Sequence, residues 1–136
     1  MARHSPANVL LHVVWSTFRR APLLEQSQDK ELAALLASKA KENGCRVVAT
    51  GIAIDHIHVV LGLSTTATIA TVVGEMKGFS SRARTLDGAA WGWQRGYWVE
   101  SVSPSDVDLP RRYLRRQREP HDDSHPAEIW MRGSPE

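Results

Sequence analysis

The chain has 136 residues, the size of one ordinary domain, and its hydrophobic and charged fractions are 42% and 24%. This balance is typical of a globular protein, and no apolar run approaches the roughly 20 residues of a membrane span. Cys45 is the only cysteine, which excludes an intrachain disulfide and a cysteine-rich zinc cluster. No secretory signal is visible near the start, so we expect a cytoplasmic protein.

The net charge is only +2, but the charges are unevenly distributed. Residues 77–118 contain nine basic and four acidic side chains, whereas residues 119–136 contain one basic and five acidic side chains. A basic stretch is compatible with a polyanionic partner, although a solvated helix face would have the same composition. We expect a single domain over residues 1–120, followed by an acidic C-terminal tail over residues 121–136.

Apolar and β-branched runs predict four strands, and helical spacing predicts two helices among them. The expected strands cover residues 9–15, 45–54, 56–63 and 97–102. The first helix follows Ser27, a candidate N-cap, and ends at Asn43 and Gly44, while the second covers residues 68–85. The order β-α-β-β-α-β predicts a ferredoxin-like α+β fold, an antiparallel sheet with two helices on one face and the other face free.

A third helix is expected after the fourth strand. Asp106 or Asp108 can cap this helix, Pro110 fits its first turn, and the helix ends before Pro120. This added C-terminal helix carries Tyr113.

His56 and His58 are the first residues with a chemical signature. Side chains alternate along a strand, so both imidazoles are expected to point to the same face. Two neutral imidazoles can bind a divalent metal and leave coordination positions open for a phosphate oxygen and water. A pair of hydrogen-bonded histidines at the rim of the sheet would have the same spacing.

Tyr113 and Gln117 form the second signature, because residues four apart are neighbours on one helix face. Tyrosine is a poor nucleophile at its ordinary pKa of about 10, but a metal that polarises a phosphodiester makes it competent. The carbonyl oxygen of Gln117 could be a third metal ligand. A surface helix whose tyrosine only packs its ring is the alternative.

Several ordered motifs together resemble the single-tyrosine HUH transposases of small bacterial insertion sequences, which include the REP-associated tyrosine transposases. The similarity extends along nearly the whole chain. The segments at residues 12–20, 55–59, 76–82, 91–99 and 112–117 resemble the family's opening strand, His-hydrophobic-His motif, second helix, aromatic segment and tyrosine helix. Ordered motifs with correct spacing are far more specific than any one of them.

The resemblance implies that His56, His58 and Gln117 hold one Mg²⁺ or Mn²⁺ ion and that Tyr113 attacks a phosphodiester. It also implies a 5′-phosphotyrosine and a free 3′-OH, so that rejoining needs no ATP, in agreement with a chain that has no Gly-rich phosphate-binding motif. The implied partners are single-stranded DNA with hairpins and a second copy of the chain in a homodimer. The tyrosine helix of one subunit can complete the metal site of the other.

Other residues are candidates for supporting roles. Asp55 and His12 can orient a histidine ligand, with a turn residue and a hydrogen-bonded core histidine as the respective alternatives. The candidate DNA contacts are the basic residues Arg19, Arg20, Lys77, Arg82, Arg112, Arg115 and Arg116. A solvated surface is the alternative for these.

The predicted function is therefore that of a transposase that cleaves and rejoins single-stranded DNA. Two other functions remain open. One is a domesticated relative that holds DNA hairpins without chemistry. The other is a metal-dependent phosphoesterase that uses water as its nucleophile, in which Tyr113 is dispensable.

Overall fold

The computed structural model describes residues 9–86, 92–119 and 125–133. Its sheet contains β1 (Val9–Ser16), β2 (Arg46–Ile52), β3 (His56–Leu63) and β4 (Trp98–Val102). The strands lie in the order β2-β3-β1-β4, and all neighbours are antiparallel. The helices α1 (Asp29–Glu42) and α2 (Ile69–Leu86) complete the β-α-β-β-α-β order, which confirms the predicted ferredoxin-like fold.

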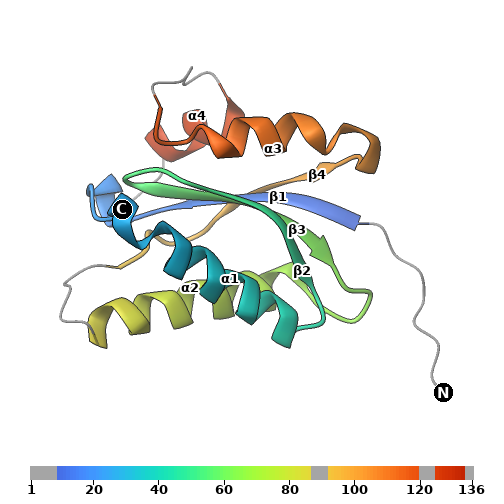
Figure 1. The fold of residues 1–136 in the computed structure, drawn as a ribbon, viewed down its shortest axis with the longest axis horizontal. Coiled ribbons are helices and arrows are strands. Elements are labelled where there is room, and N and C mark those ends of the chain that lie inside the picture. Colours follow the sequence, from blue (N-terminus) through green and yellow to red (C-terminus); the bar gives the residue numbers. More distant parts are fainter. Residues whose placement is uncertain (1–8, 87–91, 120–124, 134–136) are drawn as a thin grey trace.

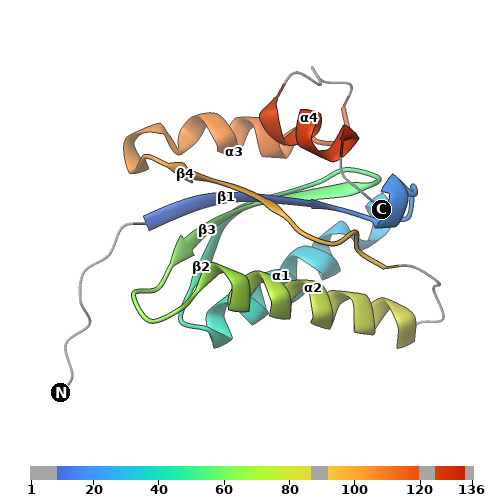
Figure 2. The ribbon, with the colours of Figure 1, turned by 180° about the vertical axis from the view of Figure 1, so that it is seen from behind.

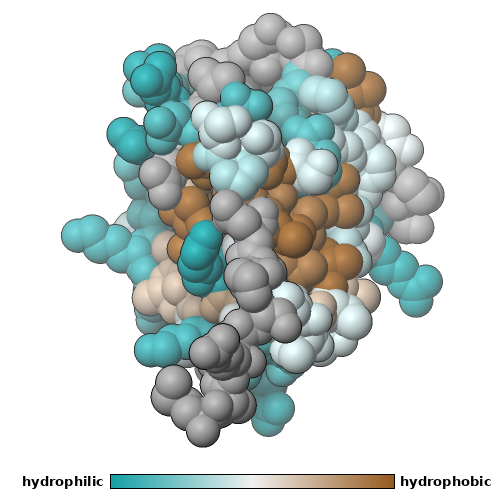
Figure 3. Space-filling view, turned by 90° about the vertical axis from the view of Figure 1, so that its right-hand side faces the viewer, coloured by the Kyte–Doolittle hydropathy of each residue, from teal (hydrophilic) through white to brown (hydrophobic). Residues whose placement is uncertain are grey.

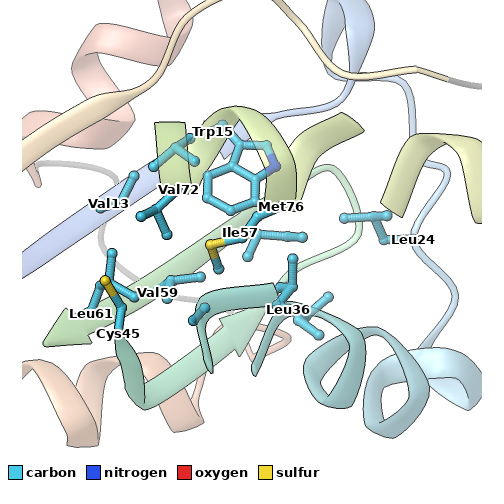
Figure 4. Packing of buried hydrophobic residues seen from close by; sticks show 13 residues of the cluster. Val13, Trp15, Leu24, Leu36, Cys45, Ile57, Val59, Leu61, Val72 and Met76 are labelled. Atoms are coloured by element: carbon cyan, nitrogen blue, oxygen red, sulfur yellow. The ribbon is translucent and has the colours of Figure 1, made fainter. Parts of the chain in front are cut away.

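The main hydrophobic core lies between the sheet and the helices α1 and α2 (Figure 4). Alternate residues of the two central strands point into it, among them Trp15 of β1 and Ile57 of β3, both fully buried. Leu36 of α1 and Met76 of α2 meet them from the helices. Burial of these apolar side chains is the main favourable contribution to folding.

The opposite face of the sheet is covered by α3 (Asp108–Arg115) and α4 (Pro126–Arg132), as Figures 1 and 2 show. The prediction that this face stays free is therefore wrong. Ala127 and Met131 of α4 pack against Val14 of β1 in a second, smaller hydrophobic cluster. Leu10 and Val14 on this face of β1 are apolar, and their burial favours such a cover over exposure to water, whereas His12 and Ser16 on the same face are polar.

Several helix boundaries also differ from the predictions. Ser27 lies in a short 3-10 turn and does not cap α1, which begins at Asp29. Val107 occupies the N-cap position of α3, so neither of the predicted aspartates caps this helix. The helix ends at Arg115, earlier than predicted, because turns with i to i+3 hydrogen bonds follow it. The predictions also missed α4, which lies in the segment expected to be an acidic tail.

The central and edge strands differ in regularity. β3 pairs with β1 without interruption. In contrast, β2 contains a β-bulge at residues 47–49, where it has one residue more than β3. His56 and His58 pair with Ser16 and Val14 in the uninterrupted ladder between β3 and β1.

Hydrophobic surface gathers at the end of the sheet where β1 begins (Figure 3). Val9, the first residue of β1, is 46% exposed there. No helix among the described residues is long and apolar enough to cross a membrane.

Gly51 of β2 allows α3 to approach the sheet closely. A Cβ atom at this position would lie 2.8 Å from both Leu114 Cα and Gln117 Cγ, which is shorter than real Cβ contacts allow. The absence of a side chain at Gly51 therefore determines how near to the sheet the segment with Tyr113 and Gln117 can lie.

Replacing Gly51 with alanine should lower the free energy of unfolding by about 1–3 kcal/mol, because the added methyl group overpacks the contact with α3. Gly74→Ala is the matched control, since nothing lies within 4 Å of a Cβ at this position of α2. We expect the control to raise the free energy of unfolding by roughly 0.5–1 kcal/mol. Urea unfolding followed by tryptophan fluorescence measures both variants. Equal stabilisation by the two substitutions would contradict the close approach at Gly51.

Candidate metal centre and nucleophile

His56 and His58 project from β3 toward the face that α3 and α4 cover. They are 2% and 0% exposed, and their ring centroids lie 5.1 Å apart. Ile57, between them, points into the main core on the other face. Strand alternation therefore brings both imidazoles to one place, as the sequence pattern predicts.

Glu128, in the first turn of α4, brings a buried carboxylate to the two histidines. Its Oε1 atom lies 3.0 Å from His56 Nε2 and 3.7 Å from His58 Nε2. One ligand atom from each of the three residues lies within 4.8 Å of the others, a spacing that could hold a metal ion. The sequence predictions missed Glu128, although Pro126 and Gly133 are signals for the two ends of a short helix.

Gln117 reaches the same centre from the turn that follows α3. Its Oε1 atom lies 3.1 Å from His56 Nε2, and its Nε2 atom donates a hydrogen bond to the Tyr113 carbonyl at 3.1 Å. This second bond favours the amide orientation in which oxygen faces the histidine. The structure thus brings His56, His58 and Gln117 together, and Glu128 joins them.

The Tyr113 side chain lies at the edge of this group. Its hydroxyl donates to Glu128 Oε1 at 3.4 Å, and its ring lies edge-on to His58 with centroids 5.2 Å apart. On its other side the ring stacks on His125, again with a centroid distance of 5.2 Å.

Asp55, which is itself paired with Arg20, holds the Nδ1 side of the His56 ring. Asp55 Oδ1 accepts a hydrogen bond from His56 Nδ1 at 2.7 Å, and Arg20 Nε lies 3.2 Å from Asp55 Oδ2. Arg20 Nη2 also lies 3.6 Å from Glu128 Oε2. Arg19 and Arg20 both have a φ of 55°, in the left-handed region that residues other than glycine rarely adopt. The chain therefore holds a strained turn where it presents Arg20 to the site.

The two histidines of β3 have opposite pKa shifts. Burial lowers the pKa of His56, but hydrogen bonds and charges from Asp55 and Glu128 outweigh this effect and raise it to about 9. Burial lowers the pKa of His58 to about 4, and the nearby Glu128 carboxylate does not compensate. Burial raises the pKa of Asp55, but His56 and Arg20 hold it below its ordinary value. At pH 7 the metal-free protein therefore has a cationic His56 and a neutral His58.

His12 of β1 lies next to His58. Its Nε2 atom is 2.8 Å from His58 Nδ1, so one ring donates its N–H to the other. Burial, together with the neighbouring His58 and His125, lowers the pKa of His12 to about 3. A neutral His12 can determine which nitrogen of His58 carries the proton.

The chain matches the model of a family described as "Transposase IS200 like" over residues 5–117. It belongs to the IS200-like transposase family. This result confirms the resemblance seen in the sequence motifs, and it supports a DNA-processing enzyme. A search of the curated proteins found no match.

Two solved structures share the fold of this IS200-like chain. One is a proposed transposase from Deinococcus radiodurans R1, with a TM-score of 0.65 and 24% identity, and the match covers 87% of this chain and 97% of that chain. The other is a REP-associated tyrosine transposase bound to a REP hairpin, with a TM-score of 0.61 and 14% identity. That match covers 84% of this chain and 70% of the other.

The basic residues predicted to contact DNA have different surroundings in the IS200-like chain. The exposed ones are Arg19, Arg82, Arg112, Arg115 and Arg116, and Arg20 is half-buried. Lys77 instead donates hydrogen bonds to the carbonyls of Gln94 and Gly96, at 2.9 and 2.8 Å. Burial lowers the pKa of Lys77 to about 8. The Lys77 ammonium therefore ties α2 to the segment before β4.

Two cavities flank the group of polar side chains around Glu128. One, of about 360 Å³, is lined by residues that include Arg20, His56, Gln117, Arg118 and Glu128. The other, of about 420 Å³, is lined by residues that include His12, Glu100, Asp106, Tyr113 and His125. In the first cavity the two guanidinium groups offset the carboxylates of Asp55 and Glu128, whereas no arginine or lysine among the described residues that line the second offsets its two carboxylates. An anion is therefore favoured in the first.

Asp55→Asn should lower the pKa of His56, because the substitution removes a negative charge and a strong acceptor. A histidine whose pKa rises on folding stabilises the protein fully below pH 6.5, and this stabilisation is lost as the pH rises through about 9. The metal-free wild type should therefore lose more stability over this interval than the variant. Urea unfolding at several pH values, with a chelator present, measures the change in stability. An NMR titration of the His56 ring measures its pKa. An unchanged His56 pKa in the variant would rule out the role of Asp55.

Proposed function

We propose that this chain cleaves and rejoins single-stranded DNA, with Tyr113 as the nucleophile and His56, His58 and Gln117 as ligands of one Mg²⁺ or Mn²⁺ ion. The observation that carries the proposal is the contact of the tyrosine hydroxyl with Glu128, which also contacts both histidines. Family membership supports a reaction on DNA.

The side chains around Glu128 fit a divalent cation. His58 Nε2 is buried and has no hydrogen-bond partner within the described part of the chain, while it lies 3.7 Å from Glu128 Oε1. His56 Nε2 and Gln117 Oε1 complete the proposed set of two nitrogen donors and one oxygen donor, and the Glu128 carboxylate lies beside this set. Carboxylate and carbonyl oxygens suit Mg²⁺ and Mn²⁺, and imidazoles are common ligands of divalent metals. When bound, the ion would stabilise the negative charge that develops on the phosphate.

Tyr113 supplies the oxygen that attacks phosphorus. Its hydroxyl proton passes to Glu128 Oε1, 3.4 Å away, as the bond between the tyrosine oxygen and phosphorus forms. The bond between phosphorus and the 3′ oxygen breaks, and this oxygen takes a proton from water to become a free 3′-OH. The 5′-phosphate remains on Tyr113, so attack by another 3′-OH reverses these steps and joins the strands without ATP.

Charge supports the cavity beside Arg20 as the position of the phosphate. The Arg20 guanidinium is partly exposed there, and guanidinium groups bind phosphate oxygens through parallel hydrogen bonds. The cavity on the other side of Tyr113 contains Glu100 and Asp106, which repel a phosphate. Arg112 and Arg115 are exposed on the same helix as Tyr113 and can contact the backbone of the bound strand.

The proposed partner is single-stranded DNA with hairpins. The shared fold with a REP-associated tyrosine transposase bound to a REP hairpin supports this partner. Two protomers in a homodimer would hold two DNA ends together. In the proposed dimer each protomer uses its own Tyr113, which lies against His58 of the same chain.

Tyr113→Phe should abolish the covalent adduct between the protein and a labelled DNA strand and reduce cleavage by roughly 1000-fold or more, because the ring remains and the nucleophile is lost. Tyr97→Phe is the matched control and should retain cleavage. Denaturing gels that separate free DNA from the adduct measure both. Undiminished cleavage by Tyr113→Phe would favour the phosphoesterase that uses water, and hairpin binding without cleavage by the wild type would favour the domesticated binder.

His58→Ala should lose cleavage but retain hairpin binding within about threefold, since phosphate contacts supply most of the affinity for DNA. The variant removes a proposed ligand while Arg112, Arg115 and Arg20 remain. Cleavage assays over a range of Mn²⁺ concentrations and gel-shift assays separate chemistry from binding. Wild-type cleavage by this variant at saturating Mn²⁺ would remove His58 from the proposed centre.

A further inference from the structure

A second cluster of potential metal ligands, formed by His12, Glu100 and His125, lies on the other side of Tyr113. His12 of β1 and Glu100 of β4 are partners in the antiparallel ladder, so their side chains stand next to each other on one face. His125, at the N-cap of α4, has its ring centroid 5.4 Å from that of His12. One ligand atom of each of the three residues lies within 4.8 Å of the others.

This cluster has a buried inner side and an open outer side. His12 is 2% exposed, whereas Glu100 is exposed and all three residues line the cavity of about 420 Å³. Two imidazoles and one carboxylate around an open position are a ligand set typical of solvent-accessible zinc sites. We propose that His12, Glu100 and His125 bind Zn²⁺ or a similar transition-metal ion, at a site separate from the centre proposed for Mg²⁺ or Mn²⁺.

The contact between His12 and His58 makes the two sites exclude each other. A neutral imidazole binds a metal through the nitrogen that carries no proton. His12 Nε2 is engaged with His58 Nδ1, so Nδ1 of His12 is the atom left for zinc. With zinc there, the His12 proton lies on Nε2 and is donated to His58 Nδ1. The proton of His58 then lies on its Nε2, the atom that the first centre needs.

His125 links the same two sites through α4. Its Nδ1 atom accepts a hydrogen bond from the Ala127 backbone N–H at 3.1 Å, which caps the helix. Binding of zinc at Nε2 requires the proton of the ring to lie on Nδ1, and this ends the cap. Glu128 follows Ala127 in the same turn, so zinc also loosens the support of the carboxylate in the first centre.

Zinc at the second site should therefore inhibit cleavage. This regulatory effect rests on the proposed function, whereas zinc binding at the cluster does not. The two parts are tested separately.

Binding is tested by calorimetric titration of Zn²⁺ into the metal-free His56→Ala protein, in which the first centre has lost a ligand. In this background Glu100→Gln should weaken Zn²⁺ binding about tenfold or more, because it replaces a negatively charged carboxylate ligand with a neutral amide. Glu75→Gln, at an exposed glutamate of α2, is the matched control and should leave the affinity unchanged. Equal affinities in the two variants would overturn the site.

A second measurement does not depend on the fold of His56→Ala. Co²⁺ bound to the otherwise unchanged chain has visible absorption that reports its ligands. Glu100→Gln should alter this spectrum and Glu75→Gln should not. Identical spectra for the two variants would also overturn the site.

Inhibition is tested by adding Zn²⁺ to cleavage reactions with saturating Mn²⁺. Glu100→Gln should raise the half-inhibiting Zn²⁺ concentration about tenfold relative to wild type and leave cleavage without Zn²⁺ within about twofold. The same inhibition in Glu100→Gln and Glu75→Gln would overturn the exclusion between sites. If neither the wild type nor the two variants cleave DNA without Zn²⁺, the proposed function fails. The calorimetric titration with Zn²⁺ then tests the second site by itself.

Discussion

Burial of the Glu128 carboxylate is the constraint on which the arrangement of this face depends. A carboxylate that leaves water destabilises the fold unless cationic or hydrogen-bonding groups surround it. Here the partners are His56 of β3, Tyr113 of α3 and Arg20 in the turn after β1. Each partner belongs to a different element, so one charge fixes the positions of three segments relative to α4. The strained turn at Arg20 follows from the same requirement, because it brings a guanidinium to the second carboxylate oxygen.

The two faces of the sheet bury different kinds of side chain. On one face, Ile57 of β3 and Trp15 of β1 pack beneath α1 and α2. On the other face, His56, His58 and His12 form a buried polar layer beneath α3 and α4. A core of apolar side chains thus supports the strands on one face, while the buried histidines lie on the other. This separation depends on the alternation of side chains along a strand.

Local patterns were sufficient for most of the fold and for part of the candidate site. The order of strands and helices follows from periodicity, His56 and His58 follow from alternation, and Tyr113 and Gln117 follow from helical spacing. Glu128 was missed because its helix has seven residues, too few for a periodic signal, and follows an acidic stretch typical of a tail. The pairing of Glu128 with His56 depends on packing between segments far apart in the chain, which no local pattern encodes. The packing of α3 and α4 on the second face of the sheet was missed for the same reason.

The contrast between the regular β3 and the bulged β2 has a consequence for where insertions and deletions can occur in this family. One residue inserted into or deleted from β3 would turn the imidazoles into the apolar core and the isoleucine toward the polar layer, because side chains alternate with a period of two. The extra residue at positions 47–49 shows that the edge strand β2 accommodates an added residue. Insertions and deletions among relatives should therefore accumulate along the outer strand and in the loops, while the central strands vary only by substitution.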